Sequence, residues 1–141
     1  MLDRIYGLIL KAQQAKVPVV FVQHDEALEY DGVIHPRIAP RGNEPVVHKM
    51  QPDAFHETDL QKILDELGVE SLVVAGFQTD FCINATSRQA HQLGYGVTIV
   101  QDAHSTTGAT TTEAQATIAD YNQQFASFAD LVSADAMTFV V

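Results

Sequence analysis

A cysteine and a lysine, each placed just after an apolar run, are the residues of this sequence with the clearest chemical potential. Cys82, the only cysteine, follows Gly76 and Thr79 where an apolar run turns into an expected helix, and Lys49 follows a short run at 46–47. Thiols attack as thiolates, and a helix N-terminus with a nearby cation favours the thiolate. Backbone N–H groups of such a turn can also bind an oxyanion, as acyl-transfer enzymes require. Position alone leaves Cys82 open to a second interpretation, as a small buried hydrophobic residue.

The elements that position these residues alternate between amphipathic helices and apolar strands. Helical periodicity predicts a helix ending before Pro18, one from a capping box at Thr58 to Gly68, one over about 81–93, and one from about Thr110. Apolar runs predict strands at 17–22, 46–47, 71–75 and 97–100, and a short segment at 131–132. This alternation predicts an α/β domain with a parallel sheet and right-handed crossovers.

The candidate residues should share one edge of that sheet, because ligands of parallel sheets bind beyond the carboxyl ends of the strands. This rule places Lys49, the turn at 76–82 and Asp102 on one rim. Glycine-rich phosphate-binding motifs are missing, since Gly94 and Gly96 precede a strand rather than a helix. Nucleotide binding is therefore disfavoured.

Size and charge exclude several classes of function. The 141 residues are 46% hydrophobic, which suits a single domain over 1–141 with a continuous core. A net charge of −10 would repel a phosphate backbone, so nucleic acid is not an expected partner. No apolar run reaches the roughly 20 residues that span a bilayer, so no membrane association is expected. A lone cysteine forms no intramolecular disulfide, which fits a reducing cytoplasm.

Segments along nearly the whole chain resemble the isochorismatase-like cysteine hydrolases. The similar segments are Val47-His-Lys49, Asp53-Ala-Phe55, Thr58-Asp-Leu60, Val73-Val-Ala-Gly76, Thr79-Asp-Phe-Cys82, Ala85-Thr86, Ala90, Leu93-Gly-Tyr95 and Val100-Gln-Asp-Ala103. The resemblance implies a doubly wound, mainly parallel sheet with helices on both faces, in a Rossmann-like three-layer α/β/α arrangement.

The resemblance also implies roles for the two candidate residues. Lys49 would stabilise the thiolate of Cys82, which would attack an amide or related carbonyl to form a covalent acyl-enzyme that water then releases. A non-proline cis peptide between Phe77 and Gln78 would turn the Gln78 N–H beside that of Cys82 to form an oxyanion hole. From the residues alone, Lys49 could instead be a solvated lysine at a strand end.

Four further residues are candidates for binding the substrate: His24, Phe55, Phe81 and Thr79. Phe55 could equally belong to the core, and His24 could cap the end of a strand. The long segment 24–45, with its three prolines and two glycines, is expected to carry substrate specificity.

One part of the family pattern is missing. Members begin with a strand that ends in an aspartate, which the resemblance implies to be the base for the thiol and the acid for the leaving amine. This chain starts at the helix that follows. Asp3 lies in that helix and Asp25 follows the second strand, so neither fits, although Asp25 is the best substitute. We expect either a longer protein with residues upstream of Met1, or a shortened relative that repacks or borrows a strand.

No metal or other cofactor is expected. The nicotinamidase branch of the family adds a metal site of aspartate and histidines near the second strand. His24, Asp25, His35 and His48 lie in the corresponding region, but the adjacent His24-Asp25 pair lacks the Asp-x-His spacing of that branch. The remaining histidines, His56, His91 and His104, are interpreted as surface or supporting residues.

The leading hypothesis is a cysteine hydrolase that cleaves a C–N bond of a small amide or carbamoyl compound and forms homo-oligomers. The alternative is a catalytically silent member that acts as a binding or assembly module. An isochorismate-type vinyl ether hydrolase is disfavoured, because the resemblance implies that those members use no cysteine nucleophile.

Overall fold

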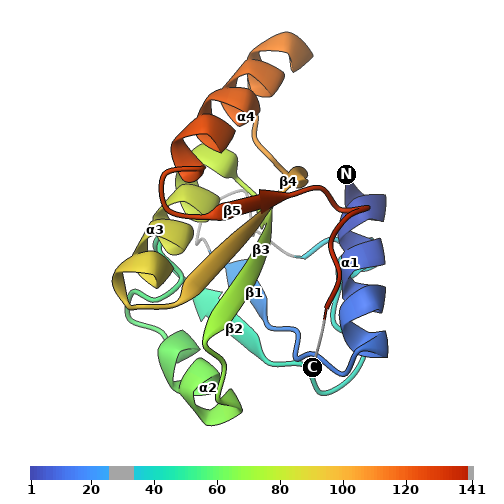
Figure 1. The fold of residues 1–141 in the computed structure, drawn as a ribbon, viewed down its shortest axis with the longest axis vertical. Coiled ribbons are helices and arrows are strands. Elements are labelled where there is room, and N and C mark those ends of the chain that lie inside the picture. Colours follow the sequence, from blue (N-terminus) through green and yellow to red (C-terminus); the bar gives the residue numbers. More distant parts are fainter. Residues whose placement is uncertain (26–33, 140–141) are drawn as a thin grey trace.

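The computed structural model describes residues 1–25 and 34–139 (Figure 1). Part of the expected specificity segment, residues 26–33, lies outside the described residues. Five strands form two parallel sheets within the described part of the chain. In the first sheet β1 (Phe21–His24) pairs with β2 (Val46–Lys49). In the second, β4 (Gly96–Ser105) lies between β3 (Ser71–Phe77) and β5 (Asp130–Val132).

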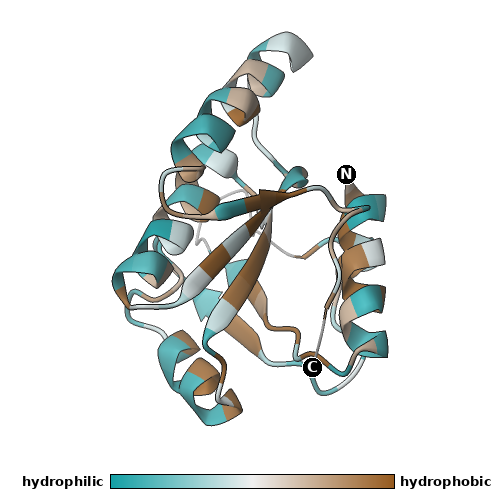
Figure 2. Cartoon of the chain, viewed as in Figure 1, coloured by the Kyte–Doolittle hydropathy of each residue, from teal (hydrophilic) through white to brown (hydrophobic). Residues whose placement is uncertain are grey.

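Helices cover both sides of these strands, which gives the expected three-layer α/β/α arrangement (Figure 1). Helix α1 (Leu2–Gln14) packs on one side, with the 3-10 turn η1 (Pro36–Ile38) beside it. The other helices are α2 (Leu60–Leu67), α3 (Asn84–Gln92) and α4 (Thr111–Phe125). The strands between the layers are mainly apolar, and the helices carry polar residues on their outer faces (Figure 2). The predicted fold class is therefore confirmed.

The core divides into clusters that follow these layers. Ile5 and Leu8 of α1 pack with Val100 and Ala103 of β4. On the opposite side of β4, Val97 and Ile99 pack with Ala90 of α3 and Phe125 of α4, whereas Val47 of β2 packs with Leu60 and Leu64 of α2. Because β4 packs against helices on both of its faces and β2 packs against α2, these strands are held in a fixed relation to one another.

Within the described residues, β1 and β3 each pair with one other strand, as β2 and β5 also do. The expectation that the family's first strand is missing from this chain stays a prediction. The strand predicted at 71–75 is not buried along its whole length, because Ser71 and Val73 are exposed, Val73 by 38%. A parallel strand is buried when neighbours cover it fully, and β3 is an edge strand.

Several predicted element ends are also wrong, and the strand predicted at 17–22 is β1 at Phe21–His24. β4 continues to Ser105, so Asp102 does not mark its end, and the Asp102 carboxylate accepts a hydrogen bond from Ala134 N–H at 2.8 Å and pairs with Arg4. Helix α2 begins at Leu60 rather than Thr58. Thr58 Oγ1 still accepts from Leu60 N–H, at 3.2 Å, so it supports the helix from the turn before it.

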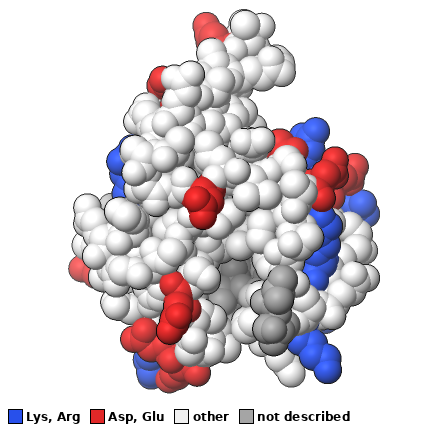
Figure 3. Space-filling model, viewed as in Figure 1, with Lys and Arg blue, Asp and Glu red and all other residues white. Residues whose placement is uncertain are grey.

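Charged side chains are distributed unevenly over the surface. On the face shown in Figure 3, acidic groups gather over α2 and basic groups over α1. Within residues 1–25 and 34–139, no helix is both long and apolar enough to cross a bilayer.

Gly68 is predicted to stabilise α2 through its backbone conformation. It terminates the helix at φ 70°, and a Cβ added there would meet no atom within 4 Å. Gly68→Ala should therefore lower the free energy of unfolding by about 1 kcal/mol, through left-handed strain alone. The matched control is Gly7→Ala inside α1, where a Cβ also has open space and the helical backbone suits alanine. That change should raise the free energy by about 0.5–1 kcal/mol in urea unfolding. Equal effects of the two substitutions would refute the assignment.

Candidate functional site

Lys49 and Cys82 meet where the two sheets come together. Lys49 is the last residue of β2, and its Nζ lies 3.0 Å from the Sγ of Cys82. Cys82 lies in η2 (Thr79–Ile83), a π-helical turn that follows β3 and continues directly into α3. Sequence reasoning named both residues, and the structure brings their reactive atoms into contact.

The ammonium group of Lys49 is buried and held in place by carbonyl oxygens. Only 4% of Lys49 is exposed, which is tolerated when its donors have partners. Nζ donates to Gln51 O and Pro52 O, both at 3.0 Å, and lies 3.4 Å from His24 Nδ1. A lysine ammonium has three protons. Two of them are directed at carbonyl groups, which leaves one for the sulfur at 3.0 Å and the more distant His24 Nδ1 at 3.4 Å.

The turn that supplies these carbonyl groups is itself fixed by a residue of α3. Thr86 Oγ1 donates to Pro52 O at 3.2 Å and accepts from Ala54 N–H at 2.9 Å. Because Thr86 lies one helical turn beyond Cys82, the sulfur and its ammonium partner are anchored to the same helix.

The turn at 76–82, which carries the candidate nucleophile Cys82 (the nucleophile turn), has a compact backbone. The Phe77–Gln78 peptide bond is cis, and Gly76 before it has φ 123°, a conformation that favours glycine. Gln78 O accepts from Phe81 N–H at 3.2 Å and Ile83 N–H at 3.0 Å. Cys82, which is partly buried, lies in this turn shortly before the start of α3.

Behind the turn lies a buried chain of polar side chains. Thr79 Oγ1 is 2.7 Å from His104 Nδ1, and His104 Nε2 is 2.7 Å from Asn122 Oδ1. Burial lowers the pKa of His104, while the Asn122 hydrogen bond and the charge of Asp102 act in the opposite direction. His104 was interpreted from sequence as a surface or supporting residue, and at 2% exposure it is not on the surface.

The four residues proposed to bind substrate have different surroundings. Phe81 is 56% exposed beside Cys82, and His24 lies next to the Lys49 ammonium. Phe55 stacks on Tyr95 with ring centroids 6.1 Å apart and packs against the core clusters. Thr79 is fully buried, with its hydroxyl group at His104. Of this set, Phe81 is therefore the exposed side chain and His24 the one in contact with the Lys49 ammonium group.

The two aspartates considered as substitutes for the family base have other partners. Asp25 lies 3.0 Å from His48 Nδ1 and accepts from Gln23 at 3.1 Å, and the hydrogen bond from His48 holds the pKa of this exposed carboxyl group below its ordinary value. Asp3 accepts from Arg37. Within the described residues, no carboxylate hydrogen-bonds to Lys49 or Cys82.

No group of three or more His, Cys, Asp and Glu side chains in the described residues could hold a metal ion. His48 faces Asp25, whereas His24 lies beside Lys49, so these neighbouring histidines are not arranged as one ligand set. His35 caps η1, where its Nδ1 accepts from Arg37 N–H at 3.1 Å.

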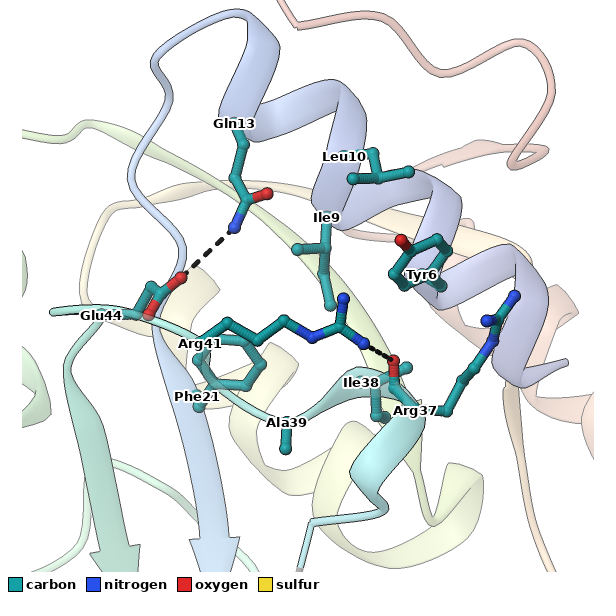
Figure 4. A pocket seen from close by; sticks show the side chains of 10 residues that line it. All are labelled: Tyr6, Ile9, Leu10, Gln13, Phe21, Arg37, Ile38, Ala39, Arg41 and Glu44. Atoms are coloured by element: carbon teal, nitrogen blue, oxygen red, sulfur yellow. Dashed lines mark hydrogen bonds between the residues drawn. The ribbon is translucent and has the colours of Figure 1, made fainter.

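A separate small cavity lies between α1 and the segment 36–44, on residues that do not include the thiol or its lysine (Figure 4). Its volume is about 30 Å³, and its walls include Tyr6, Ile9 and Arg41. The guanidinium groups of Arg37 and Arg41 lie 4.4 and 5.3 Å from the Tyr6 ring centroid. Because so small a volume holds little more than a water molecule, we place no substrate there.

Sequence reasoning missed the residues that hold the two reactive groups in place. The carbonyl groups of Gln51 and Pro52 leave no signal in side-chain identity, because any residue supplies a carbonyl. The His104–Asn122 contact joins residues 18 positions apart and became visible only with the fold.

Comparison with known proteins places the chain in a family. The model of the isochorismatase domain matches residues 1–135. The chain belongs to the isochorismatase family. A streptothricin hydrolase of Streptomyces noursei is 37% identical over 75% of this chain, and the secreted isochorismatase effector Isc1 of Verticillium dahliae is 33% identical over 70%. The chain spans 41% and 56% of the length of these two relatives.

The fold is shared with solved members of the family. A crystal structure of an isochorismatase from Pseudomonas putida matches 96% of this chain and 76% of its own, with a TM-score of 0.82 and 26% identity. The arrangement of the isochorismatase family is thus retained over nearly the whole chain.

The buried histidine is predicted to give stability a specific pH dependence. Because burial lowers the pKa of His104 from its ordinary value of 6.5, the unfolded chain binds a proton there more readily than the folded protein. The free energy of unfolding should fall as the pH drops through 6.5, and the loss should be complete below the folded pKa. In urea unfolding across this pH range, the free energy of unfolding of His104→Gln should fall less steeply with decreasing pH than that of the wild type. The control, His91→Gln, removes an exposed histidine and should retain the wild-type slope. Identical slopes in all three proteins would contradict this assignment.

Proposed function

We propose that this isochorismatase-family chain is a cysteine hydrolase that cleaves a C–N bond of a small amide or carbamoyl compound. The observation that carries the proposal is the 3.0 Å contact between Lys49 Nζ and Cys82 Sγ, with the ammonium group buried and directed by two carbonyl oxygens. A buried cation beside a sulfur favours the thiolate, which is the reactive form. Similarity to a streptothricin hydrolase supports a hydrolytic reaction.

The proposed reaction proceeds through two steps. The Cys82 thiolate attacks the carbonyl carbon, and the backbone N–H groups of Gln78 and Cys82 bind the developing oxyanion. The C–N bond then breaks, the amine leaves with a proton taken from solvent water, and an acyl group remains on the sulfur. Water hydrolyses this thioester to a carboxylic acid, the thiolate is regenerated, and one proton returns to the solvent.

Proton transfer to the amine is the step for which the described residues supply no carboxylate. Asp3 and Asp25 are bound to Arg37 and His48, so neither takes the role that the family resemblance gives to its aspartate. Proton transfer needs hydrogen-bond reach before any matching of pKa values.

Surroundings of the sulfur favour a substrate with an apolar portion. Phe81, Phe77 and Met50 are among the large exposed hydrophobic residues, and each adjoins a residue of the site in the chain. Together with His24, the exposed Phe81 ring forms the proposed contact surface for substrate. Phe55 and Thr79 would contribute by packing and positioning.

We further propose a single domain, a cytoplasmic location and homo-oligomers. The lone cysteine suits a reducing compartment. The Verticillium relative is a secreted effector, so family membership alone does not fix the compartment. Exposed Phe77 and Phe81 would favour association between copies.

A second candidate function is a catalytically silent binding or assembly module. It is favoured by one observation, namely that no carboxylate of the described residues hydrogen-bonds to Lys49 or Cys82. The hydrolase and the module differ in whether the thiol reacts and whether a C–N bond is cleaved.

The first experiment measures thiol reactivity. Cys82 should be alkylated by iodoacetamide near neutral pH, and Lys49→Ala should slow the reaction by about tenfold or more, because the cation that favours the thiolate is lost. Lys62→Ala, which removes an exposed lysine of α2, is the matched control and should react like the wild type. If Lys49→Ala unfolds, Lys49→Met fills the same space without charge. Equal rates in a folded Lys49 variant and the wild type would exclude the proposed ion pair.

The second experiment measures turnover. A panel of small primary amides and N-carbamoyl compounds should release ammonia with the wild-type protein, and Cys82→Ala should abolish the release, because no other nucleophile is proposed. Ammonia release that persists in Cys82→Ala would rule out the covalent mechanism. A thiol that is unreactive in folded wild-type protein, together with no release, would favour the binding module.

A further inference from the structure

A chain of buried side chains joins helix α4 to the nucleophile turn. It runs from Asn122 of α4 through His104 near the end of β4 to Thr79, the first residue of η2. Both contacts of the imidazole are 2.7 Å long, and Thr79 and His104 are 0% and 2% exposed. Water therefore does not compete for these hydrogen bonds, and their geometry is set by the protein alone.

The direction of each hydrogen bond follows from the amide of Asn122. Its Nδ2 donates to Gln101 O at 3.1 Å, which leaves Oδ1 facing His104. An amide oxygen can only accept a hydrogen bond, so the ring proton of His104 lies on Nε2 and is donated to Asn122 Oδ1. A neutral imidazole then has a lone pair on Nδ1, and the Thr79 hydroxyl group donates to it.

The neutral form of the ring fits its surroundings. Burial lowers the pKa of His104, and the charged group that acts on it, Asp102 of β4, is occupied by Ala134 N–H and Arg4. An imidazolium would carry a second N–H toward Thr79, whose hydroxyl group would then have to turn its own proton elsewhere. The observed contacts thus define one tautomer and one hydroxyl orientation.

A local irregularity of the second sheet brings His104 to this position. Val74 of β3 pairs with Ile99 of β4, yet the next paired residue, Gly76, lies opposite His104. The extra residues of β4 place the imidazole beside the start of the nucleophile turn. The Phe125 ring packs edge-on against it, with centroids 5.7 Å apart, and closes the other side.

We infer that His104 is a positioning residue that holds Thr79, and through it the turn carrying Gln78 and Cys82, in the reactive arrangement. This inference rests on the proposed function, in which the N–H groups of that turn bind the oxyanion. His104 touches neither the sulfur nor the proposed substrate surface. It acts by fixing the hydroxyl group of Thr79 as a donor, with Asn122 fixing the tautomer in turn.

Two pairs of substitutions distinguish a positioning role, which needs the hydrogen bond between His104 and Thr79, from a role in which these side chains only fill space. His104→Asn puts an amide oxygen near the place of Nδ1 and can still accept from Thr79, whereas His104→Gln keeps a donor toward Asn122 and loses that acceptor. Thr79→Ser keeps the hydroxyl group that Thr79→Val removes. The measurement is the rate of Cys82 alkylation by iodoacetamide in proteins shown to be folded by circular dichroism, with His91→Gln as a control outside the chain of contacts.

The expected order of the alkylation rates depends on whether a variant keeps the hydrogen bond that Thr79 makes to the position of Nδ1. His104→Asn should react about five- to tenfold faster than His104→Gln, and Thr79→Ser faster than Thr79→Val by a similar factor, as suits one buried hydrogen bond. Rates that follow the melting temperatures instead, or that are equal within each pair, would overturn the inference. In ¹⁵N NMR spectra of the wild-type protein, His104 should carry its proton on Nε2. A proton on Nδ1 would overturn the inference even if every variant failed to fold.

The same data distinguish this inference from the proposed function. If the rates follow the expected order but no amide in the panel is cleaved, the positioning role stands and the hydrolase proposal fails. If amides are cleaved through Cys82 while the paired variants react alike, the hydrolase stands and the positioning role fails.

Discussion

The structure depends most on one constraint, which is that a buried ammonium group must be compensated on every side. Lys49 satisfies it with two carbonyl oxygens and the sulfur of Cys82. Removing either partner of such a pair leaves a buried charge without compensation, which is costly. The turn at 51–54, the end of β2 and the start of α3 are therefore held in one arrangement.

The two sheets of the fold are linked at the Lys49–Cys82 contact. β2 belongs to one sheet and β3, which leads into η2, belongs to the other, and no strand pairing joins the two sheets within the described residues. The Lys49–Cys82 contact and the hydrogen bonds of Thr86 link them instead. On the far side of the turn, Thr79, His104 and Asn122 tie the same segment to α4. The sulfur is thus held between two sets of polar contacts that come from different layers.

Part of the fold and of the site could be predicted from sequence, because those parts depend on local sequence patterns. The apolar periodicity of α1 and the glycine after α2 indicate their elements directly, and the similarity of Lys49 and Cys82 to a family motif indicates their partnership. Other features depend on tertiary context. The polar run Gln101-Asp-Ala-His104 hides the end of β4, because α1, α4 and the segment after β5 supply partners for the Asp102 and His104 side chains and for the Gln101 carbonyl group. Whether a lone histidine such as His104 is buried cannot be read from its neighbours in the chain.

We propose that folding turns the Cys82 thiol into a reactive nucleophile by placing the Lys49 ammonium group against it. The most direct measurement compares the rate of Cys82 alkylation by iodoacetamide in the native protein with the rate in urea-unfolded protein at the same pH. The native protein should react faster, by about tenfold or more, even though Cys82 is partly buried there. A native rate equal to or below that of the unfolded chain would show that Lys49 does not activate the thiol.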